Sequence, residues 1–566
     1  MRGWVIGVLA ALGLSACATT PRPPAQPVEV QILAINDFHG NLEVPKPVDI
    51  VGAYGVKRPV ITGGAGHLAA ALAGLRRGHR ETITVSAGDL IGASPLTSAY
   101  FLDEPTILAM NRMGLAFDAV GNHEFDRGHQ ELVRMQRGGC EKYTTREPCR
   151  VQKPFKGARF QFLAANVIGP DGQPIFAPAA VRQFGPVKIG FIGMTLKETA
   201  TLASPSGVAG LTFADEAATA NALVPKLKAQ GVDAIVLMIH QGGRTPAFDQ
   251  GQGCNGLTGD IVPILARLDP AITTIISGHT HWAYVCQRGE GGTQGRQLMT
   301  SAGKNGYFVT DLRLSFDRST RQLLTQRADN LLVGNGERGD DAVVAALVSL
   351  YSRAAAPIAG RPVGQLSGPA SYAVTDEESP AADLVADAQL AATAARDRGA
   401  ADLSFINATG VRTDLIPAAD GTVTFGQIFA LQPFGNNLVV KTLTGAQLKA
   451  LLEQQFAIRN GQPEVQSLLV PSANFRFTYD LNRPNGQRIQ SMLLKGKEID
   501  PAERYRVTVN NFLASGGDGF SVLIQGTDAF DAGLDLDALE SWLATNPTVP
   551  TVGRTASIIT PVAAQP

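Results

Sequence analysis

Pairs of potential metal ligands recur in short polar segments of this 566-residue chain. Asp37 and His39 stand two residues apart in "NDFHG", and His279 and His281 stand two apart in "SGHTH". In an extended segment, side chains two residues apart point to the same side, so each pair can reach one cluster. A single histidine is more often an ordinary hydrogen-bonded residue. However, five of the eight histidines lie in such segments, which chance rarely produces.

Three further segments add ligands of the same kind. Asp89 in "SAGDLIGASP" offers a carboxylate that can bridge two cations, Asn122 in "GNHEFDRG" offers a neutral oxygen, and His240 in "IHQGG" offers an imidazole. This mixture of nitrogen and oxygen ligands suits zinc, manganese, iron or cobalt better than calcium. Two such ions, roughly 3.5–4 Å apart, can hold the attacking and the leaving oxygen of a phosphate displacement.

Each polar segment follows an apolar stretch typical of a buried strand. These stretches include "VEVQILAI", "ETITVS", "VDAIVLMI" and "AITTII", and helix-like segments such as "GHLAAALAGLRR" lie between several of them. Alternating strands and helices predict an α/β fold. Because ligands bind beyond the carboxyl ends of the strands in such folds, we expect the five polar segments to converge on one dinuclear metal site.

Length and composition limit the remaining possibilities. A chain of 566 residues is too long for one ordinary core, so at least two domains are expected. Hydrophobic residues make up 44% and charged residues 17%, which is typical of a globular protein. The formal net charge of −1 shows no basic excess, so we expect no nucleic-acid polymer as a partner. No obligate protein partner is evident.

The N-terminus has the form of an export signal. Residues 1–17, "MRGWVIGVLAALGLSAC", combine Arg2 with an apolar core too short to span a bilayer, and "LSAC" resembles the bacterial lipobox. Cys17 would then carry the lipid, and the Pro-rich residues 18–28 would form a tether to the membrane. We therefore expect an exported, lipid-anchored protein, held at the outer membrane if the cell has two. An ordinary secretory signal cleaved elsewhere is the alternative.

Four cysteines remain after Cys17: Cys140, Cys149, Cys254 and Cys286. An even number in an exported chain suggests disulfides, and four cysteines allow three pairings. The pairs Cys140–Cys149 and Cys254–Cys286 close the shortest loops and are favoured. Buried free thiols are the alternative.

The five polar segments together resemble the five blocks of the calcineurin-like metallophosphoesterases. With "NHEFD" and a long second half, the chain is similar to the bacterial periplasmic and animal ecto-5′-nucleotidases. The resemblance implies an N-terminal four-layered α/β/β/α catalytic domain at 29–335 and a linker helix and hinge at 336–362. It also implies an α/β nucleotide-recognition domain at 363–560, with a hinge rotation that closes the pocket over substrate.

The resemblance also implies roles for individual residues. One metal would be held by Asp37, His39, Asp89 and His281, and the other by Asp89, Asn122, His240 and His279. His123 would stabilise the phosphoryl charge or protonate the leaving oxygen, Asp126 would orient His123, and a metal-activated water would be the nucleophile. From the residues alone, Asn122 and Glu124 also fit a helix start, as its cap and first-turn acid.

The second half carries no comparable metal ligands, and the resemblance implies a nucleoside pocket there. The matching residues are Asn407, Gly410, Arg412, Phe434, Phe512 and Asp518. Two phenylalanine faces can hold any base, although each phenylalanine alone is more often part of a core, and an arginine can pair with phosphate. The segment "SPAADLVADAQLAATAARDR" departs from the family pattern, since Arg396 or Arg398 match its phosphate-binding arginine only with a shift. Phosphate recognition from this side is therefore left open.

The sequence thus predicts an exported phosphohydrolase with two divalent metals that releases phosphate from nucleotides, as 5′-nucleotidases do. A 2′,3′-cyclic-nucleotide phosphodiesterase with 3′-nucleotidase activity, or a nucleotide-sugar pyrophosphatase, is the alternative, because base stacking serves all of these equally. A non-catalytic surface lipoprotein that binds nucleotide or metal is the alternative from another class. Such a protein would not need His123 and Asp126.

Overall fold

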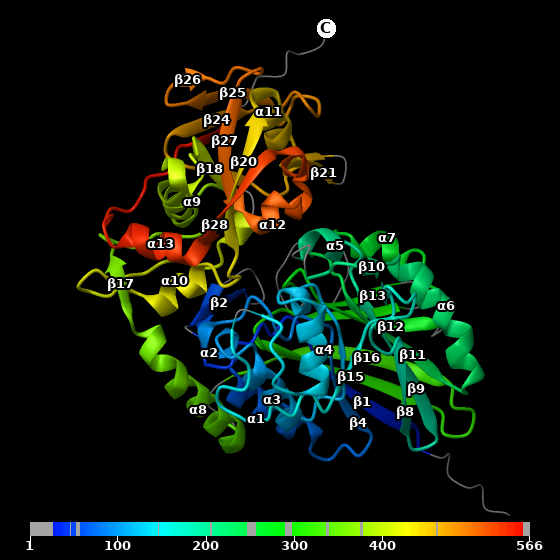
Figure 1. Cartoon of the computed structure of the whole chain (residues 1–566). Helices are drawn as coiled ribbons and strands as arrows, with labels where there is room; N and C mark the ends of the chain where they lie inside the picture. The colour runs from blue at the N-terminus through cyan, green and yellow to red at the C-terminus, as the bar shows by residue number, and fades with distance from the viewer. Residues whose placement is uncertain are drawn as a thin grey trace, which may run out of the picture.

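The computed structural model describes residues 26–45, 47–51, 57–144, 146–203, 207–245, 256–288, 297–334, 339–373, 377–459 and 462–558. These residues form two lobes (Figure 1), of which the lower runs from blue to green and the upper from yellow to red. Cys17 and Cys254 lie outside the described residues, so lipidation of the first and pairing of the second stay predictions.

The first domain contains two six-stranded sheets. In spatial order, the first consists of β16 (Leu323–Leu332), β15 (Phe308–Phe316), β1 (Val28–Ile35), β4 (Thr82–Ser86), β5 (Phe117–Ala119) and β6 (Gln161–Leu163). The second consists of β13 (Ala283–Arg288), β14 (Gln297–Ala302), β12 (Ile272–Ser277), β11 (Ala234–His240), β9 (Val187–Thr195) and β8 (Ala179–Phe184). β1, β4, β5 and β6 run parallel to one another in the first sheet, as do β14, β12, β11 and β9 in the second. Their carboxyl ends therefore deliver successive loops to a common edge.

The sheets face each other across an apolar core. Val30 and Val85 of the first sheet pack with Phe191 and Met238 of the second, and all four side chains are fully buried. The outer face of the first sheet is covered by α1 (Ala65–Arg76), α3 (Glu104–Met113) and α4 (His129–Arg137), and that of the second by α6 (Glu216–Ala229) and α7 (Ile261–Leu265). The expected α/β/β/α arrangement is confirmed.

One long helix, α8 (Ala342–Ala359), occupies most of the segment expected to link the domains. It begins where the Asp341 carboxylate accepts hydrogen bonds from the backbone N–H groups of Val343 and Val344, a typical N-cap. Val344, Leu347 and Tyr351 are buried in the helical layer of the first domain. The helix therefore packs as part of that domain, along the left side of the lower lobe (Figure 1).

The second domain is built on a five-stranded sheet. Its strands are, in order, β23 (Leu469–Pro471), β18 (Leu403–Asn407), β27 (Arg504–Asn510), β20 (Asn437–Thr444) and β28 (Thr527–Leu534). A smaller sheet consists of β26 (Lys497–Glu498), β25 (Ile489–Leu494), β24 (Phe475–Tyr479) and β29 (Thr555–Ser557). The accompanying helices include α9 (Pro380–Thr393), α10 (Phe425–Leu431), α11 (Gly445–Glu453) and α13 (Asp535–Leu543). The predicted mixed α/β character of this domain is confirmed.

The two domains share an apolar contact. Leu96 and Ala99 of α2 (Leu96–Ala99), in the first domain, are buried in the hydrophobic cluster of the second domain. Phe429 of α10 belongs to the same cluster and is fully buried. Burial of apolar side chains between the domains thus holds them in the orientation seen here.

The disulfide between Cys140 and Cys149 is present, as predicted, and closes a loop that follows α4. Cys286 is buried in β13. Because Cys254 lies outside the described residues, the pairing of these two stays a prediction.

Candidate metal centre and substrate cavity

The seven expected metal ligands come together at the carboxyl edge of the two sheets. Asp37 and His39 follow β1, Asp89 follows β4, Asn122 follows β5, His240 ends β11, and His279 and His281 follow β12. The strand order brings these loops together, because β1, β4 and β5 are neighbours in one sheet and β11 and β12 are neighbours in the other.

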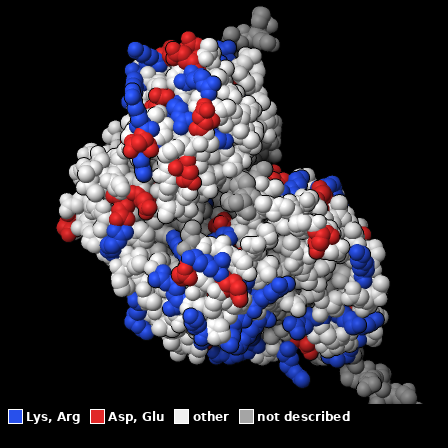
Figure 2. Space-filling model, viewed as in Figure 1, with Lys and Arg blue, Asp and Glu red and all other residues white. Residues whose placement is uncertain are grey.

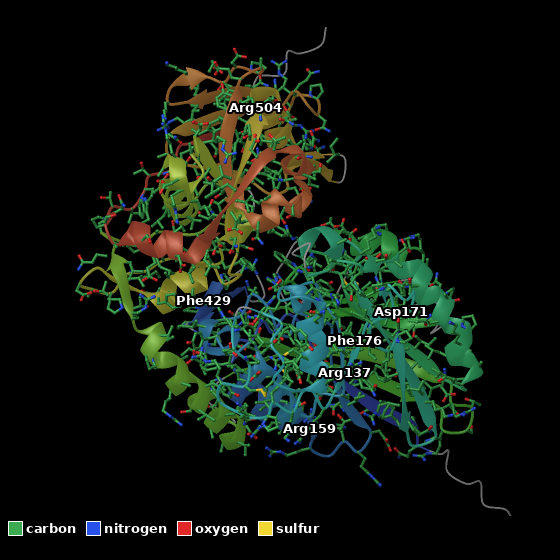
Figure 3. The ribbon with its side chains drawn as sticks, in the orientation of Figure 1. Arg137, Arg159, Asp171, Phe176, Phe429 and Arg504 are labelled. Atoms are coloured by element: carbon green, nitrogen blue, oxygen red, sulfur yellow. A yellow bond between two sulfur atoms is a disulfide. The ribbon has the colours of Figure 1, made fainter. Side chains whose placement is uncertain are left out.

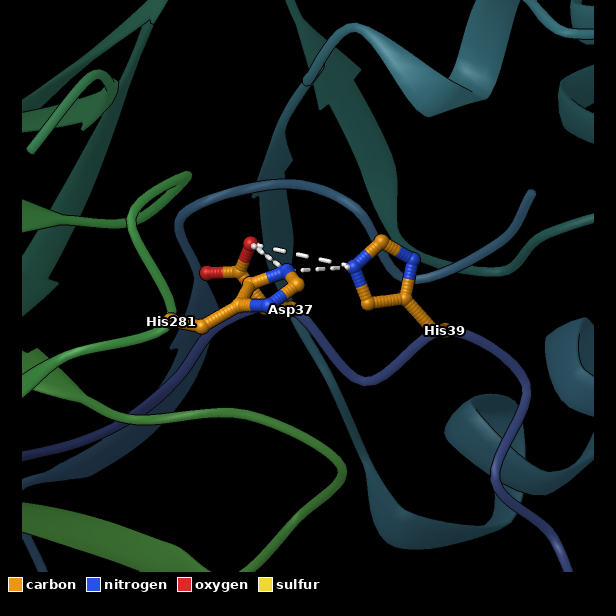
Figure 4. A group of neighbouring side chains, drawn as sticks. All are labelled: Asp37, His39 and His281. Atoms are coloured by element: carbon orange, nitrogen blue, oxygen red, sulfur yellow. Dashed lines mark hydrogen bonds and ion pairs between the residues drawn. The ribbon is translucent and has the colours of Figure 1, made fainter. Parts of the chain in front are cut away.

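Asp37, His39 and His281 form one group of candidate ligands (Figure 4). The Nε2 atoms of His39 and His281 are 3.1 Å apart, and Asp37 Oδ1 lies 3.5 Å from the His281 Nε2. Asp37 is fully buried, and His39 is nearly so. Two imidazole nitrogens and a carboxylate oxygen directed at one point form a donor set suited to a transition-metal cation.

Asp89, His240 and His279 form a second group beside the first. Asp89 Oδ2 lies 3.0 Å from His240 Nε2 in this group and 3.7 Å from His39 Nε2 in the other. Asn122 joins the second group, because its Oδ1 lies 3.1 Å from His279 Nδ1. Asp89 therefore occupies the position of a ligand shared by two cations.

Backbone groups fix the direction of the ligands. His39 donates from Nδ1 to the carbonyl of Gly92 at 3.0 Å, and His240 donates from Nδ1 to that of Ala87 at 2.7 Å. In both rings Nε2 is thereby left free to bind a cation, which is the usual arrangement of a metal-binding histidine. Five of the seven ligands have left-handed backbone conformations that L-residues rarely adopt: Asp37, His39, Asp89, His279 and His281.

The electrostatics of these groups fit bound cations. Burial raises the pKa of Asp37 to about 7 and lowers the pKa of His39 and of His279 to about 3, so both imidazoles are neutral and able to coordinate. His240 Nε2 lies 3.0 Å from Asp89; burial lowers the pKa of His240, but the negative charges of Asp89 and Asp37 outweigh burial and raise it to about 10. A divalent cation between these atoms would satisfy both of them and offset the buried negative charge.

His123 and Asp126 form the expected pair. His123 Nδ1 lies 3.0 Å from both carboxylate oxygens of Asp126. Burial lowers the pKa of His123, but the negative charges of Asp126 and Asp89 outweigh burial and raise the pKa above its ordinary value. The Asp126 carboxylate thus makes the His123 imidazole more basic beside the candidate metal centre.

A cavity of about 270 Å³ joins this pair to the second domain. From the first domain it is lined by Asn122, His123, Asp126 and His279, and from the second by Asn407, Gly410, Arg412, Phe434, Phe512 and Asp518, among others. All six residues expected in the nucleoside pocket thus line the same cavity as His123 and Asp126. Arg396 and Arg398 lie in a short 3₁₀ turn and do not line the cavity, so Arg412 is the arginine that the described residues place there.

The cavity walls are ordered by specific contacts. The Phe434 ring stacks near the His123 ring, with centroids 6.1 Å apart and planes at 16°, and the Arg412 guanidinium lies 5.7 Å from the Phe434 centroid. The Asp518 carboxylate accepts hydrogen bonds from Asn407 Nδ2 at 2.8 Å and Thr409 Oγ1 at 2.7 Å. This fixes the position of an acid that could bind a hydroxyl group.

Glu124 is a site residue that sequence reasoning assigned only to a helix start. Its buried carboxylate accepts backbone hydrogen bonds from Gly121 at 2.7 Å, Leu90 at 2.8 Å and Asp89 at 3.0 Å. It therefore ties the loop that carries Asp89 to the loop that carries Asn122. In the sequence, Glu124 is distinguished only as an acidic residue two positions after the expected ligand Asn122. The cap assigned to Asn122 is not formed, because its side chain bonds no N–H group of the following turn.

The chain matches two family models. Residues 30–283 match the calcineurin-like phosphoesterase model, and residues 362–525 match the 5′-nucleotidase C-terminal domain model. Among curated proteins, the NAD 5′-nucleotidase of Haemophilus influenzae is 26% identical over 594 residues, covering 91% of this chain and 89% of that protein. The endonuclease YhcR of Bacillus subtilis is 27% identical over 498 residues, and the chain spans only 37% of its length.

A solved structure has the same architecture. The 5′-nucleotidase precursor from Thermus thermophilus superposes with a TM-score of 0.74 at 26% identity, covering 94% of this chain and 100% of that one. The similarity therefore extends over both domains.

We expect Asp89→Ala to abolish binding of at least one cation and most hydrolytic activity, since both ligand groups would lose a shared carboxylate. Elemental analysis of the purified protein, together with phosphate release, measures both effects. Near-normal turnover with two bound metals would show that Asp89 is not shared.

We expect Glu124→Gln to weaken metal affinity about 10–100-fold, the usual effect of changing a group that orients a metal ligand. The side-chain amide of the new glutamine would direct N–H hydrogens at backbone N–H groups, which themselves need an acceptor. Competition with a chelator of known affinity measures the change. Glu104→Gln is the matched control, because Glu104 is also buried but pairs with Arg134 away from the metal ligands. If the two variants bind metal equally well, Glu124 contributes only to the stability of the fold and does not orient the metal ligands.

Proposed function

Since the chain belongs to the family of calcineurin-like phosphoesterases that carry a C-terminal 5′-nucleotidase domain, we propose that it hydrolyses nucleoside 5′-monophosphates with two bound divalent metals. The observation that carries the proposal is that His123 and His279 line one side of a cavity whose other side is lined by Phe434 and Phe512. The phosphate of one nucleotide can therefore reach His123 and His279 while its base reaches Phe434 and Phe512.

The residues at the site would have separate roles in this reaction. Asp37, His39, Asp89, Asn122, His240, His279 and His281 would hold two cations of zinc, manganese, cobalt or iron. These cations supply Lewis acidity and lower the pKa of water. His123, whose imidazole is held by Asp126, would donate a hydrogen bond or a proton to the phosphoryl or leaving oxygen. Arg412 would pair with phosphate oxygens, and Asp518 would accept a ribose hydroxyl.

We further propose that the protein acts outside the cytoplasm, anchored through Cys17. The Cys140–Cys149 disulfide supports export, because such bonds persist mainly in oxidising compartments. The lipidation itself rests on the sequence of residues 14–17, and mass analysis of the mature N-terminus would test it.

Phosphate release from a substrate panel tests the proposed reaction. We expect release from AMP in the presence of Mn, Zn or Co, and loss of release after chelation. Cyclic 2′,3′-AMP, UDP-glucose and NAD test the related reactions. His123→Ala is the control, with kcat lowered about 10²–10⁴-fold and metal content unchanged. Nucleotide binding without metal-dependent phosphate release would instead identify a binding protein.

We expect Phe434→Ala and Phe512→Ala each to raise the KM for AMP by the equivalent of about 1–3 kcal/mol, the usual worth of base–aromatic stacking. Hydrolysis of para-nitrophenyl phosphate, which has no base, should change much less. Kinetics on both substrates and a melting curve for each variant measure this. Equal losses on the two substrates with a large fall in Tm would make these residues part of the core.

A further inference from the structure

Positive charge gathers at the end of the first domain opposite the metal ligands. The ligands follow the carboxyl ends of the parallel strands, so the amino ends of β4, β5, β6 and β9 lie at the other edge of the sheets. Four segments lead into or lie beside these amino ends: 71–82, 110–117, 156–163 and 180–188. Together they contain eight Lys and Arg residues and one acid, Glu81, although the formal net charge of the whole chain is −1.

Contacts between the segments place these cations on one face. The Arg159 backbone N–H donates to Asn111 Oδ1, in the last turn of α3, at 2.6 Å. The Arg182 guanidinium lies 5.6 Å from the ring centroid of Phe117, the first residue of β5. Figure 3 labels Arg159 at the lower end of the first domain, and Figure 2 shows Lys and Arg side chains gathered on that part of the molecule.

These cations have little compensation within the chain. Arg76, Arg80 and Arg182 line a cavity of about 340 Å³, and Glu81 is the one acid among its lining residues. Six cations of the four segments are exposed and form no ion pair with any described carboxylate. We call them the basic face: Arg77, Arg80, Arg112, Lys156, Arg159 and Arg182.

Helix ends account for only part of this charge. Arg77 caps α1 and Arg112 lies in the last turn of α3, where a cation offsets the partial negative charge of the terminal carbonyls. The other four members of the basic face lie outside helices and gain nothing from such a dipole. Because like charges repel one another, a cluster without neighbouring acids points to a negatively charged partner outside the chain.

The N-terminal segment begins its first strand at the same face. β1 starts at Val28, and Arg313 Nη1 donates to the Glu29 carboxylate at 3.0 Å while lying 2.8 Å from His79 Nδ1, in the loop before β4. Cys17 is eleven residues before Val28, and a chain of that length spans at most about 40 Å. A lipid on Cys17 would therefore hold this end of the first domain close to the bilayer.

We propose that the basic face binds the anionic surface of a lipid bilayer, with the substrate cavity at the opposite end of the strands. Each Lys or Arg near such a surface is attracted by the phosphate groups of the lipids, and this attraction adds to the anchoring by a lipid chain. The inference goes beyond the proposed hydrolysis. It uses the proposed lipid on Cys17 only to explain why this face lies near a membrane.

Vesicle binding of the chain starting at residue 18 tests the proposal. This chain keeps every described residue but lacks the proposed lipid, so its binding reports on the protein surface alone. We expect it to sediment with vesicles of phosphatidylcholine and phosphatidylglycerol, and much less with vesicles of phosphatidylcholine alone. High salt should release it, because salt screens the attraction between exposed charges.

The triple variant Arg77→Gln, Arg80→Gln and Arg159→Gln removes half of the basic face. We expect its partition onto the anionic vesicles to fall about 10²-fold, since each cation near such a surface contributes about fivefold. Lys at the same three positions should retain most of the binding, because the attraction depends on charge and not on the guanidinium group.

The matched control is the triple variant Arg396→Gln, Lys449→Gln and Lys497→Gln. It removes the same charge from exposed positions in the second domain, and we expect it to bind the vesicles as the unchanged chain does. AMP hydrolysis and Tm should be unchanged in every variant, since none of the substituted residues lines the substrate cavity.

Several results would overturn the basic face as a membrane surface. These are absence of binding to the anionic vesicles, equal losses in the two Gln variants, or loss of binding in the Lys variant. Duplex DNA bound more tightly than the vesicles, and released by the same Arg→Gln changes, would identify a nucleic-acid surface instead. Absence of AMP hydrolysis by the unchanged chain would overturn the proposed function and leave this inference standing.

Discussion

The structure of the first domain depends on the cost of burying negative charge. Asp37, Asp89, Asp118 and Glu124 are all nearly or fully buried around one edge of the two sheets. Burial raises the pKa of Asp37 to about 7 and of Asp118 to about 8, which shows how unfavourable the ionised forms are without cations. Two divalent cations at this edge would turn the cost into a stabilising interaction.

The protein chain supplies part of the compensation itself. Backbone N–H groups point at the acids: His123 donates to Asp89 at 3.0 Å, and His279 donates to Asp37 at 3.0 Å. Glu124 accepts from the backbone of Asp89 and its neighbours, so it holds the loop that carries the shared ligand. The position of each of these loops is therefore fixed by hydrogen bonds to a neighbouring loop. Parallel strands make this possible, because they bring loops distant in sequence to one edge.

The sequence was informative where function requires particular side chains at strand ends. The ligand segments and the pair His123–Asp126 were recognisable because each polar cluster follows an apolar strand, and strand order then brings them together. Glu124 was not recognisable, because its role comes from backbone groups that lie more than 30 residues away in the sequence. The short-range disulfide could be predicted, because loop length alone favoured it.

The apolar contact between the domains determines how their arrangement responds to conditions. The side chains of Leu96 and Ala99 of α2 are apolar and are buried in the hydrophobic cluster of the second domain, while the Ala99 backbone carbonyl accepts a hydrogen bond from Arg146. Ionic strength screens exposed charges but has little effect on such a contact, whereas cooling weakens it, because the hydrophobic effect is largely entropic near room temperature. Separation of the two lobes is thus governed by temperature more than by salt, and an organism living in the cold would need a larger apolar surface at this place to keep the same cavity.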